Sequence, residues 1–523
     1  MAKVSFVRDA TGLVRDFSWF DAFLIGTSVI LPGIFGYSSV IGFIAGADPG
    51  ANFVLSAELA FLFMLPLGLT YVLLTWVMPR SGGDYVWVTR VANPIIGFMV
   101  AWGLWLSILA ILGIDGYLFS TLIIPISLVS FGYSTGNAGL IALAAAVTSP
   151  VTAYVLGLLM ILISFFIIIP GPRIFSRLMG IMFAIVMVGT LVSFGVLMSN
   201  SHSDFINAFN QMVGPNVTYT SIISQAQSAG WAFAPVSWGA TLLSIPLSVV
   251  VYNGFNYASA AAGEIRNVKR SIPLAIFGSL LFSLIFTIIG TQLTVNVLGY
   301  DFIQASFALG SSWPLPAPPW APLFLTMLNS NIGVVFLIQL AWLVSFFWNT
   351  AGFLLVATRY VFAFSFDGVL PVRFADIADR FHFPTKAAVL NFIIAAIFLL
   401  LATFTPWLGL FLNAVAIWSI VWILTSLVAI ILPLKKKELL SSLPGGTWKI
   451  PLVSIVGSIS LILMIATFYF SVTTPAIGPS TLQADMILSA IFLSGLIVYI
   501  VSYYDHKRKG VNLSMVYSQI PPE

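Results

Sequence analysis

Polar and helix-breaking residues interrupt two long apolar segments of this chain, and they are the strongest candidates for binding a ligand. One interruption, Asn253-Gly254-Phe255-Asn256, lies in the apolar segment that ends at Gly263. Asn and Gly weaken a helix through competing side-chain hydrogen bonds and through backbone freedom. The other, Pro32-Gly33, lies inside the first apolar segment, where Pro32 cannot donate a backbone hydrogen bond. A helix broken at membrane depth is tolerated only where its freed backbone is buried in protein or lines a cavity, so both interruptions predict a ligand site.

The chemistry available at such a break is anion binding. The N-terminus of a half-helix presents free N–H groups and the positive end of a dipole, which suit a carboxylate. Interrupted helices at corresponding positions of two halves of a chain indicate the binding site of a secondary transporter. The alternative is that both breaks are structural kinks, because Gly and Pro are common in membrane helices. The residues expected to bind substrate around the breaks are Ile30, Leu31, Gly33, Ile34, Phe35, Tyr252, Asn253, Gly254, Phe255 and Asn256.

Other polar residues at membrane depth are candidates for coupling or substrate binding. Asp115 lies slightly past the middle of the apolar segment 94–127, and an acid at that depth is costly unless it faces a cavity or a partner. It either binds a substrate amine or a proton, or is a structural carboxyl with satisfied hydrogen bonds. Trp102, one turn before Trp105, either packs or forms an aromatic wall of the substrate cavity. The candidates for the coupling ion, H⁺ or Na⁺, are Asp115, Glu58, Ser345, Asn349 and Thr350, although hydroxyls in membrane helices more often bond neighbouring backbone.

The composition is that of a polytopic membrane protein. Hydrophobic residues make up 59% of the 523 residues and charged residues only 7%, whereas a soluble domain has about 25% charged residues. The absence of cysteine excludes disulfides, thiolate metal sites and cysteine nucleophiles, and the three histidines lie far apart. We therefore expect no metal, no cofactor and no enzymatic activity, and we attribute the basic residues to membrane topology rather than to nucleic-acid binding.

Apolar windows of about 20 residues predict twelve spanning helices in an all-α integral membrane fold. The predicted spans are 20–46, 51–78, 94–127, 151–170, 174–199, 237–263, 271–298, 330–365, 384–404, 406–433, 450–473 and 484–504. With the N-terminus inside, all 21 Lys and Arg residues fall on one side of the membrane. The positive-inside rule then predicts cytoplasmic termini in the cell membrane, with lipids as neighbours.

Four motifs resemble the amino acid–polyamine–organocation superfamily of transporters. The segment YNGFNYASAAAGEIRNVKRSIPLAI, beginning at Tyr252, is similar to the sixth helix and following loop of that family, with Val268 where proline is usual. Gly33-Ile34-Phe35 matches a Gly-Ile-Phe in helix one, and Asp367-Gly368-Val369-Leu370-Pro371 matches the end of helix eight. The family loop that leads into helix three is matched by Arg80-Ser81-Gly82-Gly83-Asp84-Tyr85, Trp87, Arg90, Pro94, Gly97, Phe98 and Trp102.

The resemblance implies a leucine-transporter-like fold, in which helices 1–5 and 6–10 form inverted repeats with discontinuous helices 1 and 6, and two helices follow. It also implies alternating access, with helices 1, 2, 6 and 7 rocking against a scaffold that includes 3, 4, 8 and 9. The expected organisation is a cytoplasmic N-terminus (1–19), a first repeat (20–199), an outer loop (200–236), a second repeat (237–433), helices 11 and 12 (434–504) and a cytoplasmic C-terminus (505–523).

This chain departs from the family pattern at two places. The family commonly has Gly-Ser-Gly before Ile-Phe, where backbone N–H groups hold a substrate carboxylate; here the residues are Leu31-Pro32-Gly33, and Pro32 removes one donor. Some proton-coupled members have a lysine in helix five. Val186 stands at about that position here, so that mechanism does not carry over.

The leading functional hypothesis is a secondary transporter of amino acids or related amines, a class of small-molecule substrate, coupled to H⁺ or Na⁺. One alternative is an antiporter-like membrane subunit of a respiratory complex, but such subunits carry buried lysines, and every lysine here is expected at the cytoplasmic rim. Another alternative is a nutrient sensor on the same fold, which added soluble domains would favour. A membrane enzyme would need acids, histidines or a Ser–Lys pair clustered at one depth, and the sequence indicates none.

Overall fold

The computed structural model describes residues 13, 15–48, 50–214, 216–378, 380–406, 414–474, 482–509 and 516–519. Regular structure in these ranges is helical, and β-pairing is limited to isolated bridges. Eleven helical segments there are long and apolar enough to cross a membrane. The prediction of an all-α membrane protein is therefore confirmed.

The eleven segments match the predicted spans within a few residues, except where the predicted third span ends. They are the pair α1 (Trp19–Ile30) and α2 (Ile34–Ala45), α3 (Phe53–Val77), α5 (Pro94–Leu118) with η2 (Phe119–Ile123) and α6 (Ile124–Thr135), α8 (Pro150–Ile168), α9 (Pro172–Met198), α15 (Val268–Leu298), α18 (Ile332–Phe366), α19 (Thr385–Phe404), α21 (Ala414–Lys435), α22 (Leu452–Thr473) and α23 (Leu482–Arg508). The start of the predicted tenth span, 407–413, lies outside the described residues.

The predicted sixth span, 237–263, is not one long helix but a series of short ones. They are α12 (Trp238–Leu243), α13 (Ile245–Val249), α14 (Tyr257–Ala260) and the 3₁₀ turn η3 (Ala262–Glu264). Pro246 lies in the first turn of α13, a position that suits proline because its missing N–H is not needed there. No helix in this stretch is long enough to be counted as a span, so the twelve predicted spans appear as eleven long segments and one broken one.

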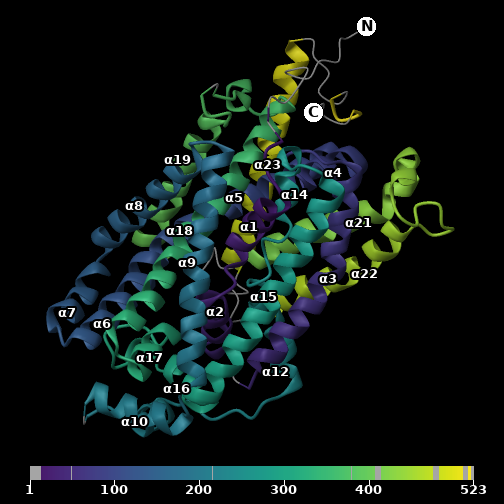
Figure 1. The fold of residues 1–523 in the computed structure, drawn as a ribbon. Coiled ribbons are helices and arrows are strands. Elements are labelled where there is room, and N and C mark those ends of the chain that lie inside the picture. Colours follow the sequence, from purple (N-terminus) through teal and green to yellow (C-terminus); the bar gives the residue numbers. More distant parts are fainter. Residues whose placement is uncertain are drawn as a thin grey trace.

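Shorter helices cap the two ends of the bundle. At one end lies α4 (Asp84–Trp87), followed in the chain by η1 (Val88–Ala92), and at the opposite end lie α10, α16 and α17 (Figure 1). The helices at that opposite end are α7 (Ala138–Val147), α10 (His202–Val213), α11 (Tyr219–Ser228), α16 (Tyr300–Ala308) and α17 (Ala321–Leu328). The remaining short turns are η4 (Gly310–Ser312), η5 (Val372–Ala375) and η6 (Lys437–Ser442).

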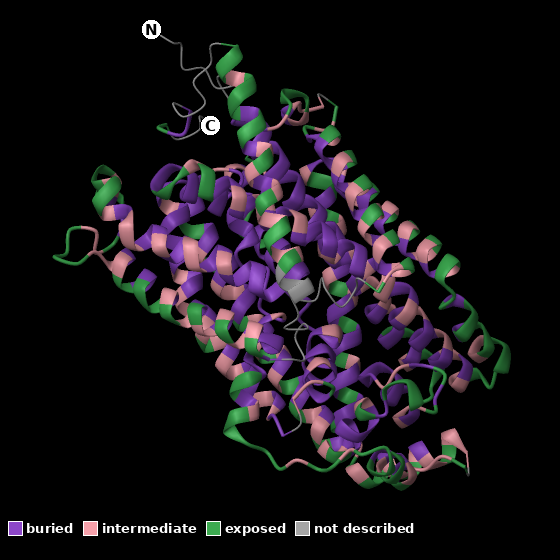
Figure 2. Ribbon diagram, turned by 180° about the vertical axis from the view of Figure 1, so that it is seen from behind, coloured by how far each residue is buried: buried purple, intermediate pink, exposed green. Residues whose placement is uncertain are grey.

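The spans pack closely because small residues meet at their crossings. A Cβ on Gly157 of α8 would lie 2.5 Å from the carbonyl oxygen of Gly116 on α5, so only glycine allows this approach. Close van der Waals packing of this kind drives helix association in lipid, because the hydrophobic effect does not bring helices together there. The interior of the bundle is buried, and exposed residues lie on its outer helices and end loops (Figure 2).

Candidate substrate site at the two broken helices

The first break lies between α1 and α2. Leu31, the C-cap of α1, adopts a left-handed conformation with φ 52°, and Gly33, the N-cap of α2, has φ 135°. Residues with side chains rarely adopt the second value, so this position requires glycine. A Cβ on Gly33 would also lie 2.7 Å from the hydroxyl oxygen of Thr190 on α9. The predicted non-helical backbone around Pro32 is confirmed.

The second break separates α13 from α14. Residues 250–256 form turns, and Gly254 has φ 129°. The backbone freed here is partly satisfied by α15, because the Ser283 hydroxyl donates to the Val251 carbonyl at 2.6 Å. The predicted interruption at Asn253 to Asn256 is therefore confirmed.

The two broken helices meet at Gly254. A Cβ there would lie 2.8 Å from the Gly26 carbonyl oxygen and 2.7 Å from Cβ of Val29, both on α1. Gly26 faces it in turn, with the Gly254 carbonyl oxygen 3.5 Å from where its own Cβ would stand. A pair of glycines thus lets the two backbones touch directly beside both breaks.

The N-terminus of α2 is partly occupied by α9. The Ile34 N–H donates to the Thr190 hydroxyl oxygen at 3.0 Å, and Thr190 in turn donates to the Val186 carbonyl. One turn further along α2, the Tyr37 hydroxyl donates to Ser193 at 3.1 Å. Thr190 was missed by sequence analysis, which considered only Val186 on this helix.

The end of α1 is held by α18. The Asn349 side-chain amide donates to the carbonyl oxygens of Ser28 and Val29, at 3.2 Å each. Ser345 donates instead to the Trp342 carbonyl, and Thr350 to the Met160 sulfur. Of the three Na⁺ candidates on α18, only Asn349 contacts a break, and it presents a donor where a cation would require acceptors.

Several polar atoms around the breaks are buried with no hydrogen-bond partner among the described residues. They are the side-chain oxygens of Asn253 and Asn256 and the Trp348 indole nitrogen. All three residues are less than 4% exposed. Buried polar atoms almost always have partners, so a cluster of exceptions indicates a place for water or a ligand.

The aromatic residues of the breaks pack on either side of them. Phe35 contacts the rings of Trp320, Trp342 and Phe346, with ring centroids 5.0–6.0 Å apart. Trp320 is the N-cap residue of α17, at the end of the bundle where α10 and α16 also lie. Tyr252 donates its hydroxyl to the Ala57 carbonyl on α3, next to the half-buried Glu58. Phe255 packs against the ring of Tyr71, also on α3. Ile30 and Leu31 are buried at the end of α1.

The candidates on α5 lie apart from the breaks. The indole N–H of Trp102 donates to Ser494 on α23, and that of Trp105 donates to Asn391 on α19, both at 2.9 Å. Asp115 has one buried carboxylate oxygen with no partner within the described ranges. The main packing partners of α5 are α8, α18, α19 and α23, so the structure does not bring Asp115 or Trp102 together with the break residues.

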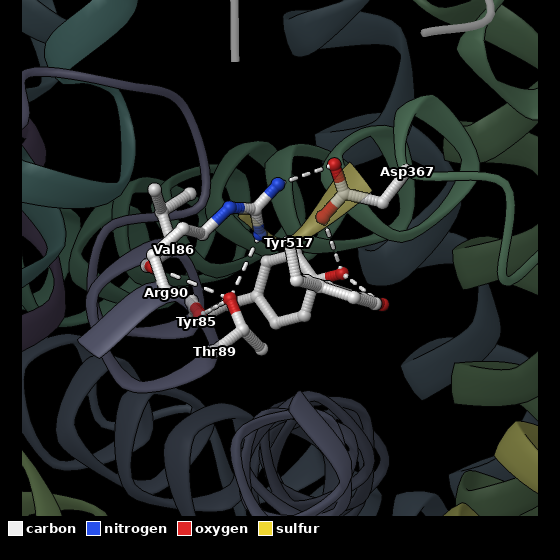
Figure 3. A network of polar contacts seen from close by, with 6 residues as sticks. All are labelled: Tyr85, Val86, Thr89, Arg90, Asp367 and Tyr517. Carbon is white, nitrogen blue, oxygen red and sulfur yellow. Dashed lines mark hydrogen bonds and ion pairs between the residues drawn. The ribbon is translucent and has the colours of Figure 1, made fainter. Parts of the chain in front are cut away.

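A buried polar network joins α4 and η1 to the end of α18. Arg90 and Asp367 form an ion pair at 2.6 Å, with both side chains at most 2% exposed. The Tyr85 hydroxyl donates to the same carboxylate at 2.6 Å, and Tyr517 from the end of the chain lies 3.3 Å from the Tyr85 hydroxyl (Figure 3). The Arg90 guanidinium lies over the Tyr517 ring, 5.0 Å from its centroid.

A second buried ion pair links the broken sixth segment to α18. Glu264 in η3 receives two contacts from Arg359, at 2.5 and 2.7 Å, and both side chains are 1% exposed. Nearby, Asp84 accepts hydrogen bonds from the hydroxyls of Tyr71 and Tyr360. Burial raises the pKa of Asp84 to about 6, and the tyrosine hydrogen bonds oppose that rise.

The segment before α1 is tied to the same end of the bundle. Phe17 exchanges backbone hydrogen bonds with Glu264 and Arg266, at 3.0 and 2.9 Å. Asp16 forms ion pairs with Arg266 and with Arg173 at the start of α9. The start of α1, the start of α9 and the segment that follows α14 are therefore joined at this end of the bundle. No group of acids or histidines suited to a metal ion occurs in the described part of the chain.

Comparison with known proteins supports this architecture. A family profile described as amino acid permease matches residues 17–497. The branched-chain amino acid permease BcaP of Lactococcus lactis is 22% identical over 484 residues, which is 90% of each chain. An uncharacterized amino-acid permease of Schizosaccharomyces pombe is 25% identical over 72% of this chain and 63% of its own length.

A third relative is named for a different substrate. The methylthioribose transporter of Bacillus subtilis is 22% identical over 395 residues, covering 73% of this chain and 74% of that protein. The permease profile covers nearly the whole chain, including both broken helices and the long spans around them. The chain belongs to the amino acid permease family.

Proposed function

We propose that this protein transports an amino acid or a related amine across the cell membrane by alternating access, with the substrate bound between the two broken helices. The observation that carries the proposal is the contact of the sixth segment with α1 at Gly254, beside the buried amide oxygens of Asn253 and Asn256, which have no partner among the described residues. Irregular backbone at membrane depth is expected only at such a site.

The charge of the site favours substrates with no net charge. Residues 28–36 and 250–263 contain no Asp, Glu, Lys, Arg or His, and burying an unpaired charge among them would be costly. A zwitterion offers a carboxylate to the N-terminus of α2 and an ammonium to the oxygens of Asn253 and Asn256. Two relatives are consistent with an amino acid substrate. One is the branched-chain amino acid permease described above. The other is a glutamate/serine transporter of Bacillus subtilis, 29% identical over 178 residues, which are 33% of this chain and 32% of that protein.

The contacts at each end of the bundle support two gates. Phe35 with Trp320 and Trp342 closes the break toward the loop helices α16 and α17. The Glu264–Arg359 pair closes it toward α4, where the basic residues gather. In the proposed cycle, one gate opens while the other is closed, and both termini lie in the cytoplasm. The moving group consists of spans 1, 2, 6 and 7, which are α1–α2, α3, α12–α14 and α15. It rocks against spans 3, 4, 8 and 9, which are α5–α6, α8, α18 and α19.

Uptake by purified protein in liposomes tests the function directly. Labelled amino acids and amines are screened with imposed H⁺ or Na⁺ gradients, and we expect accumulation of at least one neutral amino acid. Binding without transport would instead support a nutrient sensor. None of the relatives described above is a subunit of a respiratory complex, and that alternative has no support from them.

Replacing Asn256 by leucine is expected to abolish uptake. The change removes an amide oxygen that is buried without a partner among the described residues, while leucine is of similar size and fills the same buried position. Uptake and the unfolding temperature in detergent are measured together. The matched control is Asn296→Leu on the exposed side of α15, which should leave both unchanged. Normal uptake by Asn256→Leu would show that Asn256 has only a structural role.

Replacing Asp115 by asparagine tests it as a proton carrier. Because Asp115 is not among the break residues, we assign it to coupling rather than to the substrate amine. We expect gradient-driven accumulation to vanish while exchange of labelled for unlabelled substrate survives. Asp301→Asn, on an exposed loop helix, is the control. A tenfold loss of affinity confined to cationic substrates would assign Asp115 to the amine instead, and normal accumulation would show a structural carboxyl.

A further inference from the structure

Two threonines on α15 differ from the other hydroxyl residues of that helix. Thr287 and Thr291 are fully buried, and neither hydroxyl has a hydrogen-bond partner among the residues that the structure describes. Serine and threonine in membrane helices normally bond a nearby backbone carbonyl. The other buried hydroxyls of the same helix do so, since Ser271 donates to Arg266, Ser279 to Ile276, Ser283 to Val251 and Thr294 to Gly290.

The Thr287 hydroxyl is directed at the first break. A Cβ on Gly36, in the first turn of α2, would lie 3.8 Å from that hydroxyl oxygen and 2.6 Å from the Leu31 carbonyl oxygen. Because Gly36 has no side chain, the Leu31 carbonyl comes close to it, and nothing on Gly36 covers the Thr287 hydroxyl. The Thr287 hydroxyl and the Leu31 carbonyl therefore both lie beside the N-terminal turn of α2.

This helix N-terminus lacks some of its usual donors. Pro32 has no N–H, and the N–H of Ile34 is taken by Thr190. The N–H groups of Phe35 and Gly36 make no hydrogen bond within the described ranges. A carboxylate has about four lone-pair positions to satisfy, so two backbone donors leave part of it without partners.

We infer that Thr287 is a substrate-positioning residue, whose hydroxyl donates to the substrate carboxylate at the N-terminus of α2 and replaces, from α15, the donor that Pro32 cannot supply. The inference rests on the proposed function, because it requires an amino acid at the breaks. The Leu31 carbonyl oxygen lies beside the same turn and is a hydrogen-bond acceptor, which suits the ammonium group of the same zwitterion.

The test compares an amino acid with the amine that lacks its carboxylate. Thr287→Val keeps the shape of the side chain and removes the hydroxyl, whereas Thr287→Ser keeps the hydroxyl. We expect Thr287→Val to weaken binding of the transported amino acid about tenfold, since hydrogen bonds to charged groups are among the stronger ones, and to leave binding of the amine unchanged. Thr287→Ser should bind both like the native protein.

Controls separate this role from a loss of folding. Thr294→Val, on the same helix, removes a hydroxyl that donates to the Gly290 carbonyl and should not change the ratio of the two affinities. If Thr287→Val does not fold, the same comparison is made with Thr287→Ala.

The outcomes distinguish the inference from the proposed function. Native affinity for the amino acid in Thr287→Val, or equal losses for amino acid and amine, would overturn the role of Thr287 and leave the proposed function intact. Failure of the native protein itself to bind any amino acid would overturn the proposed function and this inference with it.

Discussion

Replacing Glu264 by glutamine should destabilise the protein by about 3–5 kcal/mol, the usual cost of removing one partner from a buried ion pair. Arg359 would keep its charge at 1% exposure with no acid to balance it. The measurement is the unfolding transition of the purified protein in detergent, followed together with uptake in liposomes. An unchanged transition would contradict the assignment of this pair as a buried, mutually neutralising contact.

The double variant Glu264→Leu with Arg359→Met separates loss of charge balance from loss of packing. Because a buried ion pair can be replaced by apolar residues at little cost, the double variant should be more stable than Glu264→Gln. Lys386→Gln is the surface control, since its partner Asp376 is 37% exposed and such pairs contribute about 0–1 kcal/mol. If the pair is also a gate, the double variant should transport at an altered rate while remaining folded.

Replacing Gly254 by valine should abolish uptake. The backbone at φ 129° strains any residue with a side chain, at a cost of about 1–3 kcal/mol. The new side chain would also overlap Val29 and the Gly26 carbonyl, and such overpacking costs about 1–3 kcal/mol more. Together these costs push the sixth segment away from α1, so uptake and the unfolding temperature should both fall.

Two further glycine variants grade this prediction. Gly26→Ala would place a Cβ 3.4–3.6 Å from its neighbours, an ordinary contact, so its effect should be smaller. Gly195→Ala on α9 has no neighbour within 4 Å and should be neutral or slightly stabilising, because alanine favours a helix. Equal activity in all three variants would show that the Gly26–Gly254 contact is not needed for transport.

The positions of the spans and breaks could be predicted because they depend on local sequence. The length of an apolar run sets the ends of helices such as α9 and α15, and Pro32, Asn253 and Gly254 disrupt helical hydrogen bonding wherever they occur. The sixth span departs from the prediction in one respect, since Ser244 separates α12 from α13 in addition to the predicted interruption at Asn253 to Asn256.

The contacts of the candidate site could not be predicted, because hydropathy reports depth in the membrane but not the face of a helix. Asp115 was selected for its depth, yet the main packing partners of α5 are α8, α18, α19 and α23 rather than the helices of the breaks. Thr190 and Thr287 were missed because their roles depend on which way α9 and α15 are rotated toward α2. A spacing of four residues from Ser279 through Ser283 and Thr287 to Thr291 was the one signal that could have indicated a polar face.

The insertion of Tyr517 beside Arg90 and Asp367 constrains when the protein can finish folding. Arg90 and Asp367 both leave the ribosome well before Tyr517, which follows Asp367 by 150 residues. Proteins fold from the N-terminus during synthesis, so the spans before Tyr517 can assemble while this contact is still missing. The Arg90–Asp367 pair is therefore covered only once the segment that holds Tyr517 has been synthesised, which makes this contact a late step of folding.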